Sequence, residues 1–230
     1  MIAGAVDVST SKKKKQPSAS RPQRSRKGER EVERLLLAAT TALARDGMAA
    51  ATLGRIAAEA DVDKAMVVYY FGSREVLLAQ VVKRLGERAA AEAETALEQV
   101  SSRLSPGPVA DVGVGALWGS ILAVPELPRA YMTLLSGSRD VRVREALREM
   151  KAMFIAIFHR HMDALEAQGY RLLDDRDDFV TLLFAILRGL LLEWAESGET
   201  LHLRGAIEGF KVFAASRFHI STRRRMRVLK

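Results

Sequence analysis

The chain has 230 residues, of which 48% are hydrophobic, with no cysteine and a formal net charge of +8. This length fits one large domain or two smaller ones, and the missing cysteine excludes a disulfide framework and a thiolate metal site. Residues 1–30 carry nine Lys or Arg against two acidic residues, and residues 217–230 carry six against none. The positive charge therefore lies in the two tails, and the middle of the chain is net negative.

Helix-favouring residues dominate: Ala, Leu, Arg and Glu are frequent throughout, whereas alternating runs of Val, Ile, Tyr and Thr are rare. This pattern predicts an all-α fold. Residues 1–10 lack an apolar core of signal-peptide length, and the longest apolar stretch, 179–192, is interrupted by Arg188 and too short to span a bilayer. We therefore expect a soluble, cytoplasmic protein with no membrane partner.

The N-terminal segment is polar and rich in Pro and Ser over residues 9–28, with almost no large apolar side chains. Such a segment cannot offset the entropy lost on ordering, so we expect a flexible basic arm over residues 1–28. Two roles fit this composition equally well. The arm either contacts nucleic acid, in the minor groove or at phosphates, or it is a solvated tail that aids solubility.

A helical pattern begins at residue 29, with apolar residues at three- and four-residue steps, and Gly47 is expected to end this helix. Thr52 then stands as the N-cap of a second helix, which a turn at 61–63 joins to a third short helix over 64–70. Two short helices joined by a tight turn, each too small to be stable alone, are typical of a helix-turn-helix. In that motif the second helix lies in the major groove of DNA.

The spacing of this motif separates an inner from an outer face. The inner face is expected to hold Ile56, Ala57, Ala60, Val62, Val67 and Phe71. The predicted DNA contacts are Thr52, Arg55, Asp63, Lys64, Ala65, Met66, Tyr69, Tyr70 and Arg74. Lys64 can bind guanine or phosphate, Met66 can contact a thymine methyl, and tyrosine hydroxyls can bind phosphates. The charge of Arg74 opposes the dipole of the helix that follows, so an anionic partner is expected there rather than a purely stabilising role.

A longer pattern supports the same interpretation: a Gly ends the first helix, a Thr caps the second, a Val lies in the turn, and Tyr-Tyr-Phe precedes a Ser-Arg-Glu helix start. Its positions are Gly47, Thr52, Ile56, Ala57, Val62, Lys64, Tyr69, Tyr70, Phe71, Ser73, Arg74 and Glu75. With this spacing, residues 30–80 resemble the N-terminal domain of the TetR family of helix-turn-helix transcriptional regulators. The resemblance implies a homodimer that binds a palindromic operator in double-stranded DNA and is released, as a repressor, by a small apolar effector. It implies neither a cofactor nor an enzymatic activity.

Three departures from the family pattern lie beside the predicted DNA contacts. Asp61 replaces the usual turn glycine, Asp63 the usual Ser or Thr cap, and Ala65-Met66 the common Gly-Thr pair. Because aspartates repel phosphate, no base preference is carried over from the family. Asp63 can still cap the third helix, and it can accept a hydrogen bond from a cytosine amine.

The remaining chain is expected to be helical beyond a Pro-rich break at 105–108. Helices are predicted at about 109–123, 126–137, 140–168, 177–197 and 202–217. The expected division is a basic arm over 1–28, a DNA-binding domain over 29–75, a ligand-binding and dimerisation domain over 76–217, and a basic tail over 218–230.

The last two predicted helices have broad apolar faces. These faces contain Phe179, Leu182, Leu183, Ile186, Leu190 and Trp194 in one helix and Ile207, Phe210, Val212 and Phe213 in the other. The resemblance implies that both helices pair with their copies in a four-helix dimer interface. The alternative is that these side chains form the core of a monomer.

The family resemblance also places a ligand pocket among the helices of this domain. The predicted lining residues are Trp118, Tyr131, Met132, Met150, Met153, Phe154, Phe158, Phe184 and Arg188. Methionine and aromatic side chains favour a hydrophobic effector. Arg188, inside an otherwise apolar helix, either anchors an acidic ligand head or pairs with Glu193 or another acid near the interface.

No pattern indicates an enzyme or a metal site. His159 and His161 are two residues apart and point to different helix faces, and the aspartates of 174–178 lack calcium-loop spacing and are expected to cap the following helix. The two glycines beside Val114 do not match a phosphate-binding motif well enough to predict a phosphate site. The alternative function is a helical protein whose basic tails bind nucleic acid without sequence preference.

Overall fold

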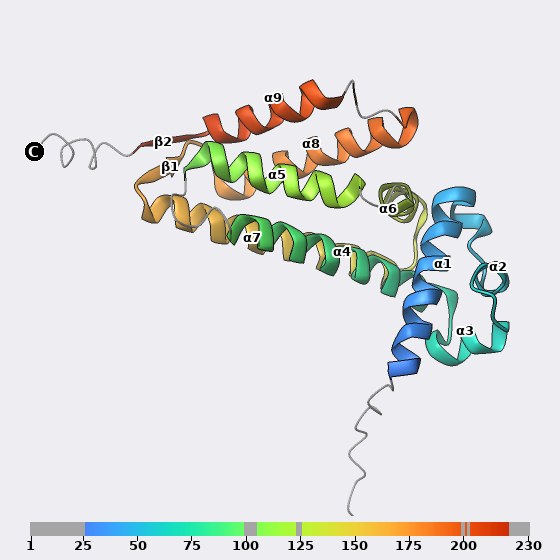
Figure 1. Cartoon of the computed structure of the whole chain (residues 1–230). Coiled ribbons are helices and arrows are strands. Elements are labelled where there is room, and N and C mark those ends of the chain that lie inside the picture. Colours follow the sequence, from blue (N-terminus) through green and yellow to red (C-terminus); the bar gives the residue numbers. More distant parts are fainter. Residues whose placement is uncertain (1–25, 99–104, 123–125, 199–200, 202, 221–230) are drawn as a thin grey trace, which may run out of the picture.

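The computed structural model describes residues 26–98, 105–122, 126–198, 201 and 203–220. Within them the chain is built almost entirely from α-helices, as Figure 1 shows. In chain order the elements are α1 Arg26–Ala50, α2 Leu53–Glu59, α3 Lys64–Phe71, α4 Arg74–Glu98, α5 Pro106–Leu122, α6 Glu126–Gly137, α7 Val141–Ala167, β1 Tyr170–Leu172, α8 Arg176–Ser197, α9 Leu203–Ser216 and β2 Phe218–Ile220. The predicted all-α class is confirmed.

The first three helices and the start of α4 form a small bundle, called here the N-terminal unit (Figure 1). Gly47 breaks the regular course of α1 with a φ of 77°, a conformation that glycine adopts readily. Thr52 caps α2 by accepting a hydrogen bond from the amide of Arg55, as predicted. The predicted inner face is buried except for Val62, which is partly buried. It packs on the buried stripe of α1 that includes Leu35 and Leu43.

The other six helices form an elongated helical body that extends away from the N-terminal unit (Figure 1). Its two longest helices, α4 and α7, lie side by side and approach closely at Gly86, where a Cβ atom would come within 2.5 Å of Met150 Cγ. Helices α5, α8 and α9 complete the body, while α6 packs against α1 of the N-terminal unit. Tyr131 of α6 and Met150 of α7 touch the apolar cores of both parts. The two cores are therefore continuous through these side chains.

Two short strands were not predicted from the sequence. β1 pairs antiparallel with β2, Tyr170 opposite Ile220 and Leu172 opposite Phe218. Each strand has three residues, which is too short for the alternation that identifies strands in a sequence. The strand pair connects the end of α7 to the end of α9. Residues 218–220 therefore belong to the folded body rather than to the predicted basic tail. The rest of that predicted tail, residues 221–230, lies outside the described residues.

Helix boundaries follow the predicted breaks closely. α6 has the predicted limits, whereas α5 begins three residues before the predicted start because proline is well tolerated in the first turn of a helix.

No single helix in the described part of the chain is long and apolar enough to cross a membrane. The pair α3 and α4 would pass such a test only together, across a bend of 68°.

Candidate DNA-binding surface and ligand cavity

Helix α3 is anchored by one face and open on the other. Val67 and Phe71 are buried against α2 and α4, and the side chain of Asp63 caps the helix by accepting a hydrogen bond of 2.6 Å from the amide of Ala65. Because α2 and α3 have only seven and eight residues, their stability comes from this packing rather than from the isolated helices. The open face is thus held in a fixed orientation.

The open face of α3 carries most of the predicted DNA contacts. Lys64, Ala65 and Met66 are exposed, and Tyr69 is 82% exposed. Tyr70 is partly buried, with its ring at 5.2 Å and edge-on to that of Tyr69. A side chain exposed to this extent is not part of the core, so Tyr69 is available to a partner.

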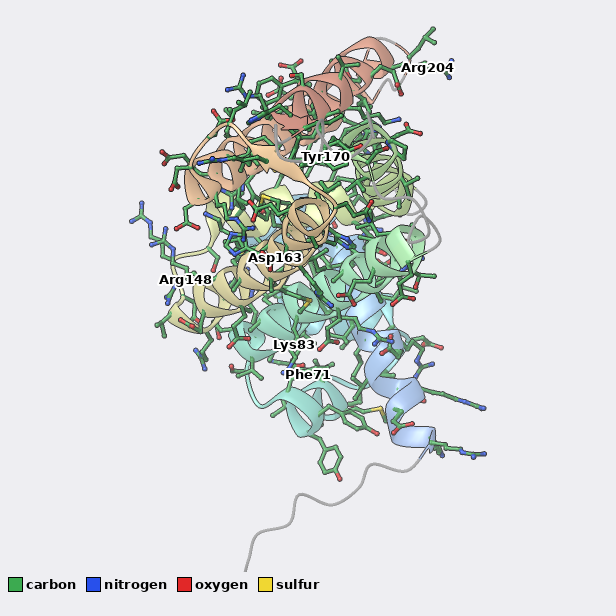
Figure 2. All side chains as sticks on the ribbon, turned by 90° about the vertical axis from the view of Figure 1, so that its left-hand side faces the viewer. Phe71, Lys83, Arg148, Asp163, Tyr170 and Arg204 are labelled. Atoms are coloured by element: carbon green, nitrogen blue, oxygen red, sulfur yellow. The ribbon has the colours of Figure 1, made fainter. Side chains whose placement is uncertain are left out.

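The open face lies at one extremity of the molecule. Figure 2 places Phe71, at the end of α3, near the end opposite Arg204 of α9. The ligand cavity described below lies in the helical body instead. The open face of α3 and the cavity are therefore separate parts of the molecule, connected by α4.

Arg55, another predicted DNA contact, takes part in a surface ion-pair cluster. Its guanidinium lies 2.8 Å from a carboxylate oxygen of Asp46, which also binds Arg45, and Arg45 bridges to Glu59. The hydrogen bond from Arg45 holds the pKa of Asp46 below its usual value. Exposed pairs of this kind contribute little stability, so Arg55 can exchange Asp46 for a phosphate at small cost.

Arg74 has a stabilising role that the sequence analysis argued against. Its guanidinium donates hydrogen bonds to the backbone carbonyls of Ala51, at 2.6 Å, and of Met48. These carbonyls lie in the segment between the kink of α1 and the N-cap of α2. The dipole of α4 is unfavourable for the positive charge of Arg74. The two carbonyl acceptors belong to a different part of the chain, so the sequence around Arg74 does not reveal them. DNA contact by Arg74 stays a prediction.

Asp63 provides a test of how the surface meets DNA. Replacing Asp63 by Asn keeps the helix cap and removes a negative charge, so we expect Asp63→Asn to bind unrelated duplexes more tightly, by about two- to fivefold at low salt. Fluorescence anisotropy over a series of salt concentrations measures this. Asp63→Ala is the matched control, because it also loses the cap and about 1 kcal/mol of stability. Weaker binding of Asp63→Asn to one preferred sequence alone would contradict the prediction and assign Asp63 to a cytosine.

A largely apolar cavity, partly open to solvent, lies in the helical body between α4, α6, α7 and α8, and the empty space in it and in its mouth is about 840 Å³. Apolar hollows between packed helices are typical positions of small-molecule sites. Six predicted residues line it: Tyr131, Met150, Phe154, Phe158, Phe184 and Arg188. The structure therefore brings together two thirds of the predicted ligand contacts.

Three predicted ligand contacts, Trp118, Met132 and Met153, do not line this cavity. Trp118 is buried on α5, a helix that contributes no residue to the lining. Met132 and Met153 each neighbour a lining residue in sequence, and a one-residue step turns a side chain by about 100° around a helix. Sequence analysis missed the lining residues of α4, which are Leu85, Arg88 and Ala89. The apolar stripe of α4 continues to Leu85 and Ala89, and this spacing was the available signal.

Arg188 is the cationic group of this cavity that has no acidic partner. Its Nε atom is buried and has no hydrogen-bond acceptor, and no ion pair is recorded for Arg188 within the described ranges. The predicted pairing with Glu193 is wrong within one chain, because five residues along a helix separate two side chains by about 140° and Glu193 is exposed. Arg88, the other arginine of the lining, lies 3.0 Å from Glu92.

The side chains that could indicate catalysis or a metal site have structural roles. Among the residues described, no group of three His, Asp or Glu is placed to hold a metal ion. Asp175 caps α8 by accepting hydrogen bonds from the amides of Asp177 and Asp178, as predicted for this run. Asp174 pairs with Arg217, which holds the pKa of its carboxyl below the usual value.

Comparisons with known proteins agree with this geometry. Residues 35–81 match the family model described as bacterial regulatory proteins, tetR family. Similar solved structures include a TetR-family regulator from Rhodococcus sp. (TM-score 0.70, 20% identity, 81% of this chain and 99% of that one) and another from Mesorhizobium loti (0.68, 18%, 84% and 96%). A third is FadR from Bacillus subtilis in complex with stearoyl-CoA (0.68, 14%, 81% and 99%). No curated protein matches the sequence.

A helix-turn-helix unit with an open outer face, attached to an all-helical body with an apolar cavity, is the architecture of a DNA-binding regulator fold. The chain shares this fold with solved TetR-family regulators, and residues 35–81 match the model of the TetR family. Proteins of this family are transcription factors rather than enzymes.

Proposed function

We propose that the protein is a homodimeric repressor that binds a palindromic operator through α3 and is released when a small hydrophobic ligand occupies the cavity of the helical body. Its proposed site of action is the cytoplasm, because its partner is DNA. The observation that carries the DNA-binding part is the open face of α3. There Lys64, Met66 and Tyr69 are exposed on a helix that Val67 and Phe71 fix to the rest of the N-terminal unit.

One stripe of exposed, mostly small or apolar positions on each of the last two helices supports the dimer. Successive positions of each stripe are four and three residues apart in turn. They are Asp178, Leu182, Ala185, Gly189, Leu192 and Glu196 on α8, where the first and the last are acidic, and Gly205, Gly209, Val212 and Ser216 on α9. A Cβ atom at Gly189, Gly205 or Gly209 would meet no atom within 4 Å, so another helix can approach these backbones closely.

The apolar residues predicted for the dimer interface differ in their exposure within one chain. Leu182 and Val212 are exposed on the stripes, and Ile186 and Phe213 are partly buried. The other six are buried in the core of one chain: Phe179, Leu183, Leu190, Trp194, Ile207 and Phe210. For these six, the alternative of a monomer core is correct. A dimer formed through the stripes would place two N-terminal units on one duplex, and successive major grooves of DNA recur every 34–36 Å, about one helical turn.

The cavity is joined to the N-terminal unit by two helices. α4 begins beside α3 and lines the cavity further along, and α6 lines the cavity and packs on α1, with Gly137 close to Met48. A ligand shifts the equilibrium between two states only by its difference in affinity for them. Helices that contact both parts can provide this difference. The FadR neighbour in complex with stearoyl-CoA supports a ligand with a large apolar part.

Selection of bound fragments from random DNA tests the function, with full-length protein and with residues 26–220 alone. We expect both to select the same palindrome, because the recognition surface lies within the shorter chain. Loss of all sequence preference on removing the tails would favour a protein that binds nucleic acid through charge only. Release of the selected palindrome by candidate apolar ligands then tests the repressor mechanism.

Two residues of α3 are expected to act differently on DNA binding. Tyr69→Phe removes a hydroxyl that we assign to a phosphate, so affinity should fall about three- to tenfold for all sequences alike. Met66→Ala should instead alter the order of preference among operator variants, because Met66 is assigned to a base edge. Binding assays with a set of single-base variants measure both effects. A sequence-dependent loss in Tyr69→Phe, or a uniform loss in Met66→Ala, would contradict these assignments.

A further inference from the structure

The apolar cavity has a neighbour with which it shares two side chains. A second hollow of about 670 Å³ lies in the same helical body, between α4, α5, α7, α8 and α9. Phe158 of α7 and Leu187 of α8 appear in the lining of both. The two hollows are therefore separated at this point by side chains, which can change rotamer, and a ligand can extend from one to the other if they do.

The two hollows differ in charge. The first, called here the outer cavity, contains Arg88 and Arg188, and Arg188 has no acidic partner in the described ranges. The second, the inner cavity, is lined by apolar side chains and by one titratable group, His161. Burial lowers the pKa of His161, so its imidazole is neutral at pH 7. One end of the combined space thus favours an anion and the other an apolar group.

Aromatic packing makes the boundary between the hollows well defined. The ring of Phe158 lies 5.9 Å from that of Phe184 and edge-on to it, and Phe184 makes a similar contact with Phe154 at 6.4 Å. Phe184 and Phe154 line the outer cavity only, whereas Phe158 reaches both. A thin chain needs only Phe158 and Leu187 to move, but a bulky ring system needs the whole aromatic cluster to move.

We propose that the effector is a single elongated amphiphile, an unbranched aliphatic chain with an acidic head. The head binds Arg188 in the outer cavity, and the chain passes Phe158 and Leu187 into the inner cavity. The role of this ligand as an effector rests on the proposed function, but its binding does not. A buried Nε atom with no acceptor, as in Arg188, is costly, and a carboxylate satisfies it while its apolar chain fills the apolar space behind it.

The experiment measures binding of straight-chain carboxylates from hexanoate to hexadecanoate, and of their methyl esters, to the full-length protein by titration calorimetry below their micelle concentrations. We expect affinity to rise with chain length beyond the length that fills the outer cavity. Arg188→Gln should lower affinity for the acids about ten- to a hundredfold and leave the esters nearly unchanged. Equal losses for acids and esters, or a change in oligomeric state with no change in affinity, would overturn the assignment of Arg188.

A pair of matched substitutions tests the passage. Phe158→Trp enlarges a side chain shared by both hollows and should weaken only the long chains, whereas Phe154→Trp enlarges a side chain of the outer cavity and should weaken short and long chains alike. Circular dichroism confirms that both variants fold. Wild-type affinity that stops rising at a short chain, or the same length profile in both variants, would overturn the proposal.

Operator binding separates this inference from the proposed function. If no carboxylate binds while the palindrome is still selected, the inference fails and the DNA-binding function stands. If the acids bind as described but do not release the operator, the amphiphile site stands and the ligand-release mechanism fails.

Discussion

Val212→Glu is expected to convert the protein from a dimer into a monomer at micromolar concentration. Val212 is 69% exposed in one chain and lies on the α9 stripe three residues after Gly209, where an added Cβ atom would meet no atom within 4 Å. In a symmetric interface the substitution buries two carboxylates, which costs about 3–5 kcal/mol. This corresponds to a dissociation constant raised by about two to four orders of magnitude. Sedimentation equilibrium measures it directly.

Loss of the dimer should also weaken operator binding. Two linked N-terminal units bind one palindrome with an avidity that typically exceeds that of a single unit by about 10²–10⁴, so we expect Val212→Glu to lose at least about a hundredfold in affinity. The matched control is Val141→Glu, because Val141 is also 69% exposed but lies at the start of α7, outside both stripes. A wild-type protein that is itself monomeric, or equal effects of the two substitutions, would refute the interface.

Arg74→Met is expected to destabilise the N-terminal unit and to weaken DNA binding together. The guanidinium binds two backbone carbonyls of the segment that leads into α2, and Arg74 is the first residue of α4, directly after the end of α3. Losing two charge-assisted hydrogen bonds at this partly buried site should reduce the free energy of unfolding by about 2–3 kcal/mol. DNA affinity should fall because α2 and α3 are then less well preorganised.

This expectation differs from that of a simple phosphate contact. If Arg74 only bound phosphate, Arg74→Met would leave stability unchanged and would lower the slope of log affinity against log salt by about one unit. Arg55→Met is the comparison, since Arg55 makes an exposed ion pair with Asp46 and should show that second pattern. Denaturant unfolding and salt-dependent anisotropy measure both variants. Unchanged stability in Arg74→Met would contradict the structural role.

The local features of the N-terminal unit could be predicted because they depend on nearest neighbours in sequence. Thr52 and Asp63 cap helices through side chains that bind amides two or three residues away, and Gly47 is the residue type that the break in α1 requires. The role of Arg74 could not be predicted in this way. Its carbonyl partners lie 23 and 26 residues earlier and come close only when the bundle has formed.

The cavity was predictable in composition but not in detail. Tyr131, Phe154 and Phe184 were predicted because the family resemblance indicates which helices line the pocket, and large apolar side chains on those helices are the candidates. Residue type and helix alone do not distinguish a side chain that lines the cavity from one that packs in solid core, such as the buried Trp118. The sequence pattern of the last two helices has the same limitation. Their apolar residues lie on two neighbouring faces of each helix, one buried in the core of the chain and one exposed on the stripe, and the pattern does not separate the two faces.

The positions of the two ends of the described chain affect how the net charge of the protein is distributed. α1 begins at Arg26 in the N-terminal unit, whereas the described chain ends at Ile220 in β2, at the opposite end of the molecule (Figure 1). The two basic segments are thus attached at opposite ends of the described chain. The attachment point of the first segment is in the N-terminal unit that carries α3, and that of the second is not. We therefore expect the first segment to contribute more than the second to the attraction between the protein and a duplex at α3.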